Sequence, residues 1–382
     1  MLKSRHILPI VLASTLLGGC STSTSSEKTS APAGNSASAS AASCGTTVDQ
    51  IATAAKKEGN VNLIALPDNW ANYAGILKSF RDTYGLEAPV ANPDASSADE
   101  LTAIKTLAGQ PSKPDAIDIG PSFVGQAMTE KLIEPYKSTN WAEIPSNLKD
   151  PDGNWVGSYY GIMSIATNTK LVSSTPTTWA DLKKPDYEGM VTINGDPREA
   201  EAAVGAVVAA ALANGGSYDD IMPGIKYFAE LKKSGNLQTM DVTPAALLSG
   251  DVPIALDWSY NFPAIKKQMQ DAGFTVAVTI PTDGLYGSYY SQSVVSDPVH
   301  PCAARLWIEH ITGNDGALGY LAGGAIPARY AALEKAGLIG DELKKDLPSA
   351  EQISKINFPT ADQISMWKKV ITENWGPMVA DA

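Results

Sequence analysis

Acidic and aromatic residues stand side by side in one segment that follows a short apolar run. Asp257, Trp258 and Tyr260 come directly after the apolar residues 254–256. A carboxylate and the face of an aromatic ring both stabilise a positive charge. A charge placed directly after a buried run is costly unless it reaches a partner or a cleft. We therefore predict that these three residues contact a ligand, and a cation is the best chemical match.

The same pairing of an acid with a ring occurs earlier in the chain. Asp68 and Trp70 follow the apolar residues 61–66. They offer a second set of contacts for a cation. A structural interpretation stands beside this one, because Asp68 can cap the following helix and Trp70 can pack in the core. Both interpretations stay open.

A segment of mixed charge opens an alanine-rich stretch. Its residues 196–199 are Asp-Pro-Arg-Glu. A helix N-terminus together with Arg198 suits an anion such as a phosphonate. Asp196 favours a cation instead, or it caps a helix that begins at Arg198 with Pro197 in its first turn. The cap is the simpler interpretation.

Hydroxyl-bearing residues supply the remaining candidates. Ser122 lies in a Gly-Pro-Ser turn whose amides can face a ligand, although turn chemistry alone explains these residue types. Tyr289 and Tyr290 could bind ferric ion, because phenolate oxygen is a hard ligand. Neighbouring residues of a strand point to opposite faces, so we expect only one of the two tyrosines to face a cleft. Iron is therefore not the preferred ligand.

Motifs for catalysis and for metal binding are missing from the sequence. It contains no nucleophile elbow, no His-Glu-x-x-His pair, no P-loop and no dinucleotide-binding glycine motif. Three histidines, at positions 6, 300 and 310, and the lack of a Cys-x-x-Cys pair give a zinc centre no support. We expect no enzymatic activity, no cofactor and no bound metal.

The first twenty residues resemble an export signal. Lys3 and Arg5 form a basic head, residues 7–17 are apolar, and residues 17–20 read Leu-Gly-Gly-Cys. The apolar run is about half of the roughly 20 residues that cross a bilayer. The Leu-Gly-Gly-Cys sequence resembles a bacterial lipobox, so we predict a signal peptide over 1–19 and a lipid on Cys20. An ordinary signal peptide with an accidental cysteine is the alternative.

Composition sets the remaining limits. Residues 20–45 are mostly Ser, Thr, Ala and Gly, which predicts a flexible linker. The chain has 382 residues and a net charge of −12. This acidity argues against nucleic acid and against an anionic lipid surface as partners; it fits a cationic ligand, or solubility alone. The length beyond the linker exceeds one ordinary core, so we expect two lobes.

The cysteines indicate a covalent link. Once Cys20 carries a lipid, Cys44 and Cys302 remain in a chain that leaves the reducing cytoplasm. Two such thiols are more often a disulfide than a metal site. We therefore predict that Cys44 and Cys302 are bonded to each other.

Apolar periodicity predicts strands that alternate with helices. Helices are expected over 48–57, 70–84, 98–107, 198–214, 221–233 and 262–272, and strands over 61–66, 88–92, 116–119, 190–193, 254–256 and 275–280. This order predicts an α/β fold with a largely parallel sheet covered by helices. Ligands of such folds lie beyond the carboxyl ends of the strands.

Six collinear segments resemble the bacterial extracellular solute-binding proteins. They lie at 61–85, 160–172, 176–191, 249–255, 300–308 and 323–329, and include Pro-Thr-Thr-Trp-Ala-Asp-Leu at 176–182 and Gly-Gly-Ala-Ile-Pro-Ala-Arg at 323–329. The chain is most similar to the branch that binds iron, polyamines, thiamine and phosphonates. Residues 257–260 match the place where polyamine binders have a tryptophan and an acid. Ferric binders have paired tyrosines there, and Trp-Ser-Tyr departs from that pattern.

The resemblance implies a type II periplasmic-binding-protein-like fold, with two lobes, two hinge crossings and a ligand cleft between the lobes. It implies a first lobe over 46–165 and 290–382 and a second over 166–289. A small ligand would be captured by lobe closure and passed to an ABC permease and ATPase in the membrane. We expect an exported monomer held at the outer face of the cytoplasmic membrane by its lipid. The favoured ligand is a polyamine such as putrescine or spermidine. The alternatives are a phosphonate or another small anion, ferric ion, thiamine and sugars; a purely structural surface lipoprotein is a remote one.

Overall fold

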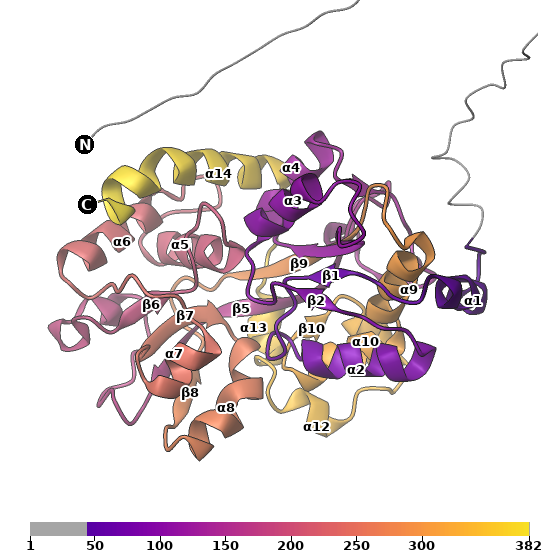
Figure 1. Ribbon diagram of the computed structural model, residues 1–382. Helices are drawn as coiled ribbons and strands as arrows, with labels where there is room; N and C mark the ends of the chain where they lie inside the picture. The colour runs from indigo at the N-terminus through magenta and orange to yellow at the C-terminus, as the bar shows by residue number, and fades with distance from the viewer. Residues whose placement is uncertain (1–43, 382) are drawn as a thin grey trace, which may run out of the picture. The chain divides into compact units, whose positions relative to one another are not determined.

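The computed structural model describes residues 44–381 (Figure 1). The predicted signal peptide, the predicted lipid site at Cys20 and the linker as far as residue 43 lie outside the described residues. Within 44–381, no helix combines the length and the hydropathy that a bilayer crossing requires.

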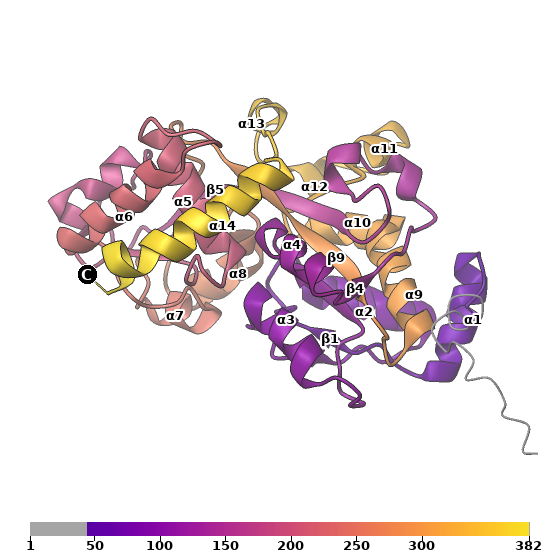
Figure 2. The same cartoon turned by 90° about the horizontal axis from the view of Figure 1, so that it is seen from above.

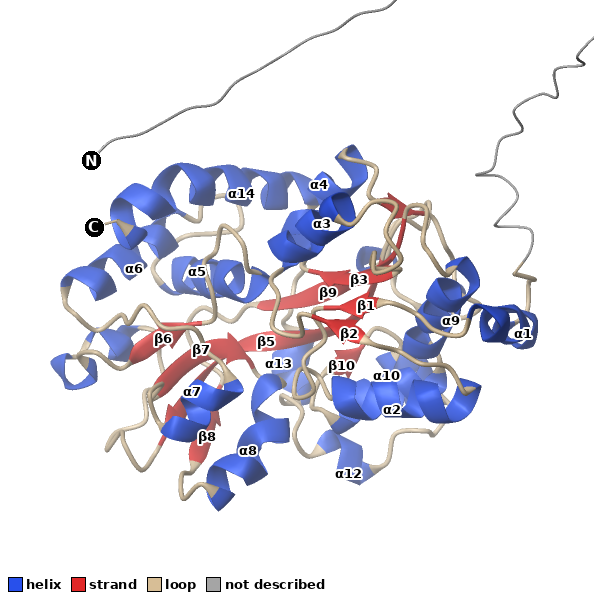
Figure 3. Ribbon diagram, in the orientation of Figure 1, coloured by secondary structure: helices blue, strands red, loops and turns tan. Residues whose placement is uncertain are grey.

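Two long strands form the middle of an eight-stranded sheet (Figure 3). They are β5 (Val156–Asn168) and β9 (Gly287–Val295), and they pair with each other in antiparallel fashion. On the far side of β9 lie β3 (Ala116–Ile119) and β4 (Ile133–Glu134), while β10 (Ile326–Pro327) pairs with the first half of β5. We call these strands, with the first half of β5, the first lobe.

The second half of β5 takes a different set of partners. It pairs with β7 (Ile254–Trp258) and β8 (Val276–Thr279), and β6 (Val191–Ile193) lies beyond β7. We call these strands, with the second half of β5, the second lobe. A separate two-stranded sheet of β1 (Leu63–Ile64) and β2 (Val90–Ala91) lies beside β3, and we count it, with the segment that follows β1, as part of the first lobe. The predicted two-lobed α/β fold is present, whereas the lobe limits at 165/166 and 289/290 remain predictions.

The prediction of a largely parallel sheet is wrong. β1–β2 and β6–β7 are parallel, but every pair that β5 or β9 forms is antiparallel. Nearly every side chain of β5 is buried, so the strand shows none of the apolar–polar alternation by which a half-buried strand is found in sequence. The sequence pattern therefore did not predict β5. Because β5 was missed, the antiparallel pairing at the centre of the sheet was missed as well.

Helices cover the sheet as expected. Where a helix was predicted, its observed ends lie within three residues of the predicted ones. The helices are α1 (Val48–Glu58), α2 (Tyr73–Tyr84), α3 (Ser97–Thr106), α4 (Pro121–Thr129), α5 (Glu201–Ala213), α6 (Met222–Lys233), α7 (Pro244–Ser249), α8 (Asn261–Asp271), α9 (Pro301–Thr312), α10 (Asn314–Ala322), α11 (Tyr330–Lys335), α12 (Asp341–Lys344), α13 (Ala350–Ser354) and α14 (Ala361–Trp375). Of these, α3 and α4 belong to the first lobe, and α5 to α8 to the second. In Figure 2, α14 extends from α4 of the first lobe to α6 of the second.

The alanine-rich helix α5 begins later than predicted. Its first residue is Glu201 and its N-cap residue, Ala200, makes no side-chain cap. Asp196 closes the preceding turn instead, because its carboxylate accepts from the amide of Arg198 at 2.8 Å and its carbonyl from the amide of Ala200 at 2.8 Å. The predicted helix cap at Asp196 is therefore wrong. Small buried side chains along α5 let α6 approach closely, and a Cβ on Gly224 would lie 2.1 Å from a carbonyl of α5.

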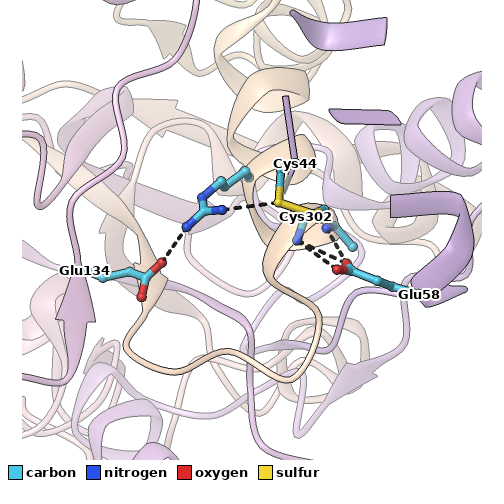
Figure 4. The surroundings of a disulfide bond; sticks show 6 residues. Cys44, Glu58, Glu134 and Cys302 are labelled. Atoms are coloured by element: carbon cyan, nitrogen blue, oxygen red, sulfur yellow. Dashed lines mark hydrogen bonds and ion pairs between the residues drawn. A yellow bond between two sulfur atoms is a disulfide. The ribbon is translucent and has the colours of Figure 1, made fainter. Parts of the chain in front are cut away.

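The predicted disulfide between Cys44 and Cys302 is present (Figure 4). It joins the segment before α1 to the first turn of α9, and these two helices pack together. Arg305 donates to Sγ of Cys44 at 3.2 Å and to Glu134 at 3.0 Å. Glu58 accepts from the amide of Cys302 at 3.0 Å, which caps the start of α9.

Candidate functional site

A cleft of about 420 Å³ lies where several strands of both lobes end. Ala65 follows β1, and Asn194 follows β6. Asp118 is the third of the four residues of β3, and Asp257 is near the end of β7. This is the place that the strand-end rule predicts for a ligand. The volume is in the range of ordinary small-molecule sites.

Carboxylates dominate the lining of this cleft. Nine of them are among its lining residues: Asp94, Asp99, Glu100, Asp118, Asp196, Glu199, Glu201, Asp241 and Asp257. No lysine, arginine or histidine of residues 44–381 lines it. Such a surface attracts cations and repels anions.

Asp118 is the buried acid of the first lobe. Its Oδ2 accepts hydrogen bonds from the hydroxyls of Tyr73, at 2.6 Å, and Tyr159, at 2.8 Å. Burial raises the pKa of Asp118 to about 7, although the tyrosine hydroxyls act in the opposite direction. Oδ1 has no partner of hydrogen-bonding geometry within the described chain. Glu100 accepts from the amide of Asp118 at 2.9 Å, and burial next to that acid raises the pKa of Glu100 well above its usual value.

Asp257 is its counterpart in the second lobe. Oδ1 accepts from the amide of Trp258 at 2.8 Å, and Oδ2 accepts from the side-chain amides of Asn261, at 2.8 Å, and Asn194, at 3.0 Å. Burial raises the pKa of Asp257 to about 7, and these hydrogen bonds lower it only in part. A carboxylate in this state gains from a cation beside it, because the cation favours the charged form.

Glu201 lies between the lobes. It is the first residue of α5 in the second lobe, yet its Oε2 accepts from the amide of Ser122 in the first lobe at 3.2 Å. Burial raises the pKa of Glu201 to about 7. Four buried acids of the cleft, Glu100, Asp118, Glu201 and Asp257, therefore have a pKa that burial raises.

Trp70 carries the aromatic part of the site. Its Nε1 donates to the hydroxyl of Tyr159 at 2.6 Å, and that hydroxyl donates to Asp118. The indole ring meets the edges of Tyr260, at 5.6 Å between ring centroids, and Tyr290, at 5.2 Å. Tyr260 follows β7, so the contact of Trp70 with it joins the two lobes across the cleft.

Four residues of the predicted site line the cleft: Trp70, Asp196, Asp257 and Tyr290. Tyr289 points to the other face of the sheet, where it stacks on Trp155 at 5.5 Å. Tyr290 thus lines this cleft, whereas Tyr289 lines a second cleft on the other face.

Besides Tyr289, five predicted residues do not line the cleft. Asp68 is exposed, and Arg198 is turned to Asp196, with which it forms an ion pair at 2.6 Å. Ser122 contributes only its backbone amide, to Glu201. Trp258 and Tyr260 are fully buried behind the cleft surface.

Sequence reasoning missed Asp118, Glu100, Glu201, Asn194 and Asn261. One signal was present for Asp118, which interrupts the otherwise apolar strand Ala-Ile-Asp-Ile at 116–119. A charged residue inside a buried strand needs a partner or a ligand. Asn194 and Asn261 carry no such signal, because polar residues after strands are ordinary turn residues.

A metal centre has no ligand set in the described part of the chain. No three His, Cys, Asp or Glu side chains of residues 44–381 come together so that they could hold a metal ion. With Tyr289 on the opposite face of the sheet, the tyrosine pair does not converge on one point either.

A family model of bacterial extracellular solute-binding proteins matches residues 112–364. The match covers most of both lobes and includes β3 to β10. The chain is a member of this family. Comparison of this solute-binding protein with curated proteins gives no match.

Solved structures of periplasmic binding proteins share the fold of this solute-binding protein. AfuA from Actinobacillus pleuropneumoniae, with fructose-6-phosphate bound, has 16% identity and a TM-score of 0.67 over 85% of this chain and 99% of its own. MotA from A. tumefaciens, in complex with glucopine, has 17% identity and a TM-score of 0.67 over 84% and 99%. Iron-bound HitA from Pseudomonas aeruginosa has 17% identity and a TM-score of 0.62 over 83% and 99%. Their ligands differ in charge and size, so the shared fold does not identify the ligand here.

Proposed function

We propose that this protein captures a small organic cation, with a polyamine such as putrescine or spermidine as the favoured ligand, and delivers it to an ABC permease and ATPase. The observation that carries the proposal is the charge of the cleft: nine carboxylates line it, and no basic side chain of residues 44–381 does. Several of these carboxylates could form an ion pair with an amine, and of the nine only Asp196 already has a cationic partner, Arg198.

Hydrogen bonding favours a ligand with N–H groups. Asp118 Oδ1, Glu201 Oε1 and Asn261 Oδ1 are buried acceptors without a partner among residues 44–381. A buried acceptor without a donor costs about 1–3 kcal/mol, and more if it is charged. A primary or secondary ammonium supplies donors, whereas a phosphonate or a sugar phosphate supplies further acceptors.

Two helix N-termini near this cleft are already used by the chain's own side chains, whereas α5 and α8 begin beside it without a side-chain cap. Ser96 and Asp99 form a capping box that uses the first amides of α3. Glu201 accepts from the amide of Ser122 in the first turn of α4. The protein's own side chains thus take amides that could bind an anionic ligand in other folds, and Arg198 is paired with Asp196.

Capture would proceed by approach of the two lobes, with the predicted limits of 46–165 and 290–382 against 166–289. Trp70 of the first lobe and Asp257 of the second would then meet the ligand from opposite sides. The lipid on Cys20, the location at the outer face of the cytoplasmic membrane and the monomeric state belong to the same proposal, and they rest on the sequence.

A thermal-shift screen of the unlipidated mature protein tests the ligand class. Putrescine or spermidine at about 100 times its dissociation constant is expected to add about 2.7 kcal/mol of stability, because only the folded state binds it. Thiamine, aminoethylphosphonate, ferric citrate and sugars serve as comparison ligands. A rise with phosphonate or iron, and none with an amine, would contradict the proposal.

Amine affinity is expected to fall as pH decreases through about 7. Burial raises the pKa of Asp118, Glu201 and Asp257 to about 7, and a cation binds best to their ionised forms. Titration calorimetry between pH 5.5 and 8.5, run at pH steps of about half a unit, measures how steeply the amine affinity changes with pH. In Asp257→Asn the slope is expected to be shallower, since one of the three groups is gone. An affinity that does not vary with pH would contradict this prediction.

The raised pKa values of Asp118, Glu201 and Asp257 also affect the stability of the ligand-free protein, which is expected to fall as pH rises, whereas amine affinity is expected to rise. Between about pH 4 and 7 the native state holds protons that the unfolded carboxyls have released, so these three residues make folding less favourable as pH rises. A bound amine is expected to remove this loss by favouring the charged forms.

A further inference from the structure

One contact between the lobes is unusually close. Glu201, at the start of α5, lies against Gly120, the residue that precedes α4. The carboxylate reaches one residue further, where Oε2 accepts from the amide of Ser122 at 3.2 Å. Glu201 is only 1% exposed, so its side chain is enclosed on all sides.

Position 120 needs a glycine because Glu201 leaves no room for a side chain there. The backbone conformation alone would not require one. Gly120 has φ −63° and ψ 153°, a conformation open to any residue. A Cβ at this position would lie 2.2 Å from Cβ and 2.3 Å from Cγ of Glu201. Both atoms belong to the base of the glutamate side chain, which cannot swing aside as its tip could. Any larger residue at 120 must therefore push the start of α5 away.

A second hydrogen bond lies beside the first. The amide of Ala98, in the first turn of α3, donates to the carbonyl of Glu199 at 3.4 Å. The segment before α5 thus touches the N-terminal turns of two helices of the first lobe. These contacts join residues that flank the same cleft, since Glu199 and Glu201 also line it.

We propose that Glu201, seated against Gly120 and bonded to the amide of Ser122, is a latch that holds the two lobes together when an amine occupies the cleft. This inference rests on the proposed function for the ligand. An ammonium group near Glu201 favours its ionised form, and an ionised carboxylate is the stronger acceptor for the Ser122 amide. Ligand charge and lobe contact are thereby coupled through one side chain.

Gly120→Ala tests the steric part of the latch. The added methyl is expected to keep the lobes apart, so that putrescine or spermidine binds at least tenfold more weakly in calorimetry. The radius of gyration with saturating amine, from small-angle X-ray scattering, is expected to stay above that of the unsubstituted protein. Gly125→Ala is the matched control, because it adds the same methyl five residues further on, within α4, with nothing within 4 Å. If Gly120→Ala matches the unsubstituted protein in both affinity and radius, the latch is wrong.

Glu201→Ala tests the hydrogen bond without any ligand. Amide hydrogen exchange of Ser122, followed by NMR in the ligand-free protein, is expected to speed up at least tenfold when its acceptor is removed. Glu201→Gln retains an acceptor oxygen and is expected to lie between the two. Equal exchange of Ser122 in Glu201→Ala and the unsubstituted protein would overturn the latch. If the unsubstituted protein binds no amine at all, the proposed function fails, and this exchange measurement still decides whether Glu201 holds the Ser122 amide across the lobes.

Discussion

Replacing Asp257 with asparagine is expected to weaken the binding of putrescine or spermidine by about 1–3 kcal/mol, or roughly 5- to 150-fold in dissociation constant. The substitution retains the shape of the side chain, removes its charge and replaces the oxygen that accepts from Asn194 and Asn261 by an NH2 group. An amide oxygen can still accept from the amide of Trp258, as Oδ1 of Asp257 does at 2.8 Å. What disappears is the charge-assisted contact with an ammonium group.

Stability separates this loss of binding from a loss of folding. Burial raises the pKa of Asp257 to about 7, so its charge makes the ligand-free fold less stable at neutral pH. Relief of the buried charge opposes the loss of the hydrogen bonds from Asn194 and Asn261, so Asp257→Asn is expected to melt close to the temperature of the unsubstituted protein. Asp186→Asn is the matched control, since Asp186 is exposed, belongs to the second lobe and does not line the cleft. Unchanged amine affinity in Asp257→Asn would remove this residue from the site.

Asp257 lines the cleft, and its position in the sequence carries a physical signal for this. A charge directly after the apolar run 254–256 has to reach a partner or a cleft, and here it reaches both. The same reasoning applies to Asp118 within strand 116–119, but the acid lies inside that run and not after it. Glu201 offers no comparable signal, since an acid at the start of an alanine-rich helix is a common first-turn residue.

At β7 the sequence analysis did not take the direction of neighbouring side chains into account. Asp257 and Trp258 are neighbours in one strand, so they point to opposite faces. Asp257 lines the cleft, and Trp258 packs on α5 so closely that a Cβ on Gly205 would lie 2.6 Å from its ring. The alternation rule was applied correctly to Tyr289 and Tyr290. Applied at 257–258, it would have separated the acid from the ring.

The strands of the fold also differ in how well the sequence predicts them: short strands are found from local patterns, and the long strand β5 is not. Short apolar strands between polar turns were found, and β3 has the predicted bounds of 116–119. The long strand β5 was not found, because its nearest partner strand along the chain, β7, is still 87 positions away (from Thr167 to Ile254), and its other partner strands are further. The family resemblance supplied the two hinge crossings that local periodicity could not.

Removing the disulfide is expected to lower stability strongly and to leave ligand affinity unchanged. Cys44 and Cys302 are 258 positions apart, and closing so long a loop restricts the unfolded chain by about 5 kcal/mol in the chain-entropy account. Measured losses in other proteins are about 2–5 kcal/mol, so the double variant Cys44→Ser/Cys302→Ser is expected to melt roughly 4–10 °C lower. Neither cysteine lines the cleft, which leaves Asp118 and Asp257 in place for the ligand. Reduction of the unsubstituted protein with a small thiol should reproduce the shift in differential scanning calorimetry. An unchanged melting temperature, or a parallel loss of amine affinity, would show that the bond does something other than restrain α1 against α9.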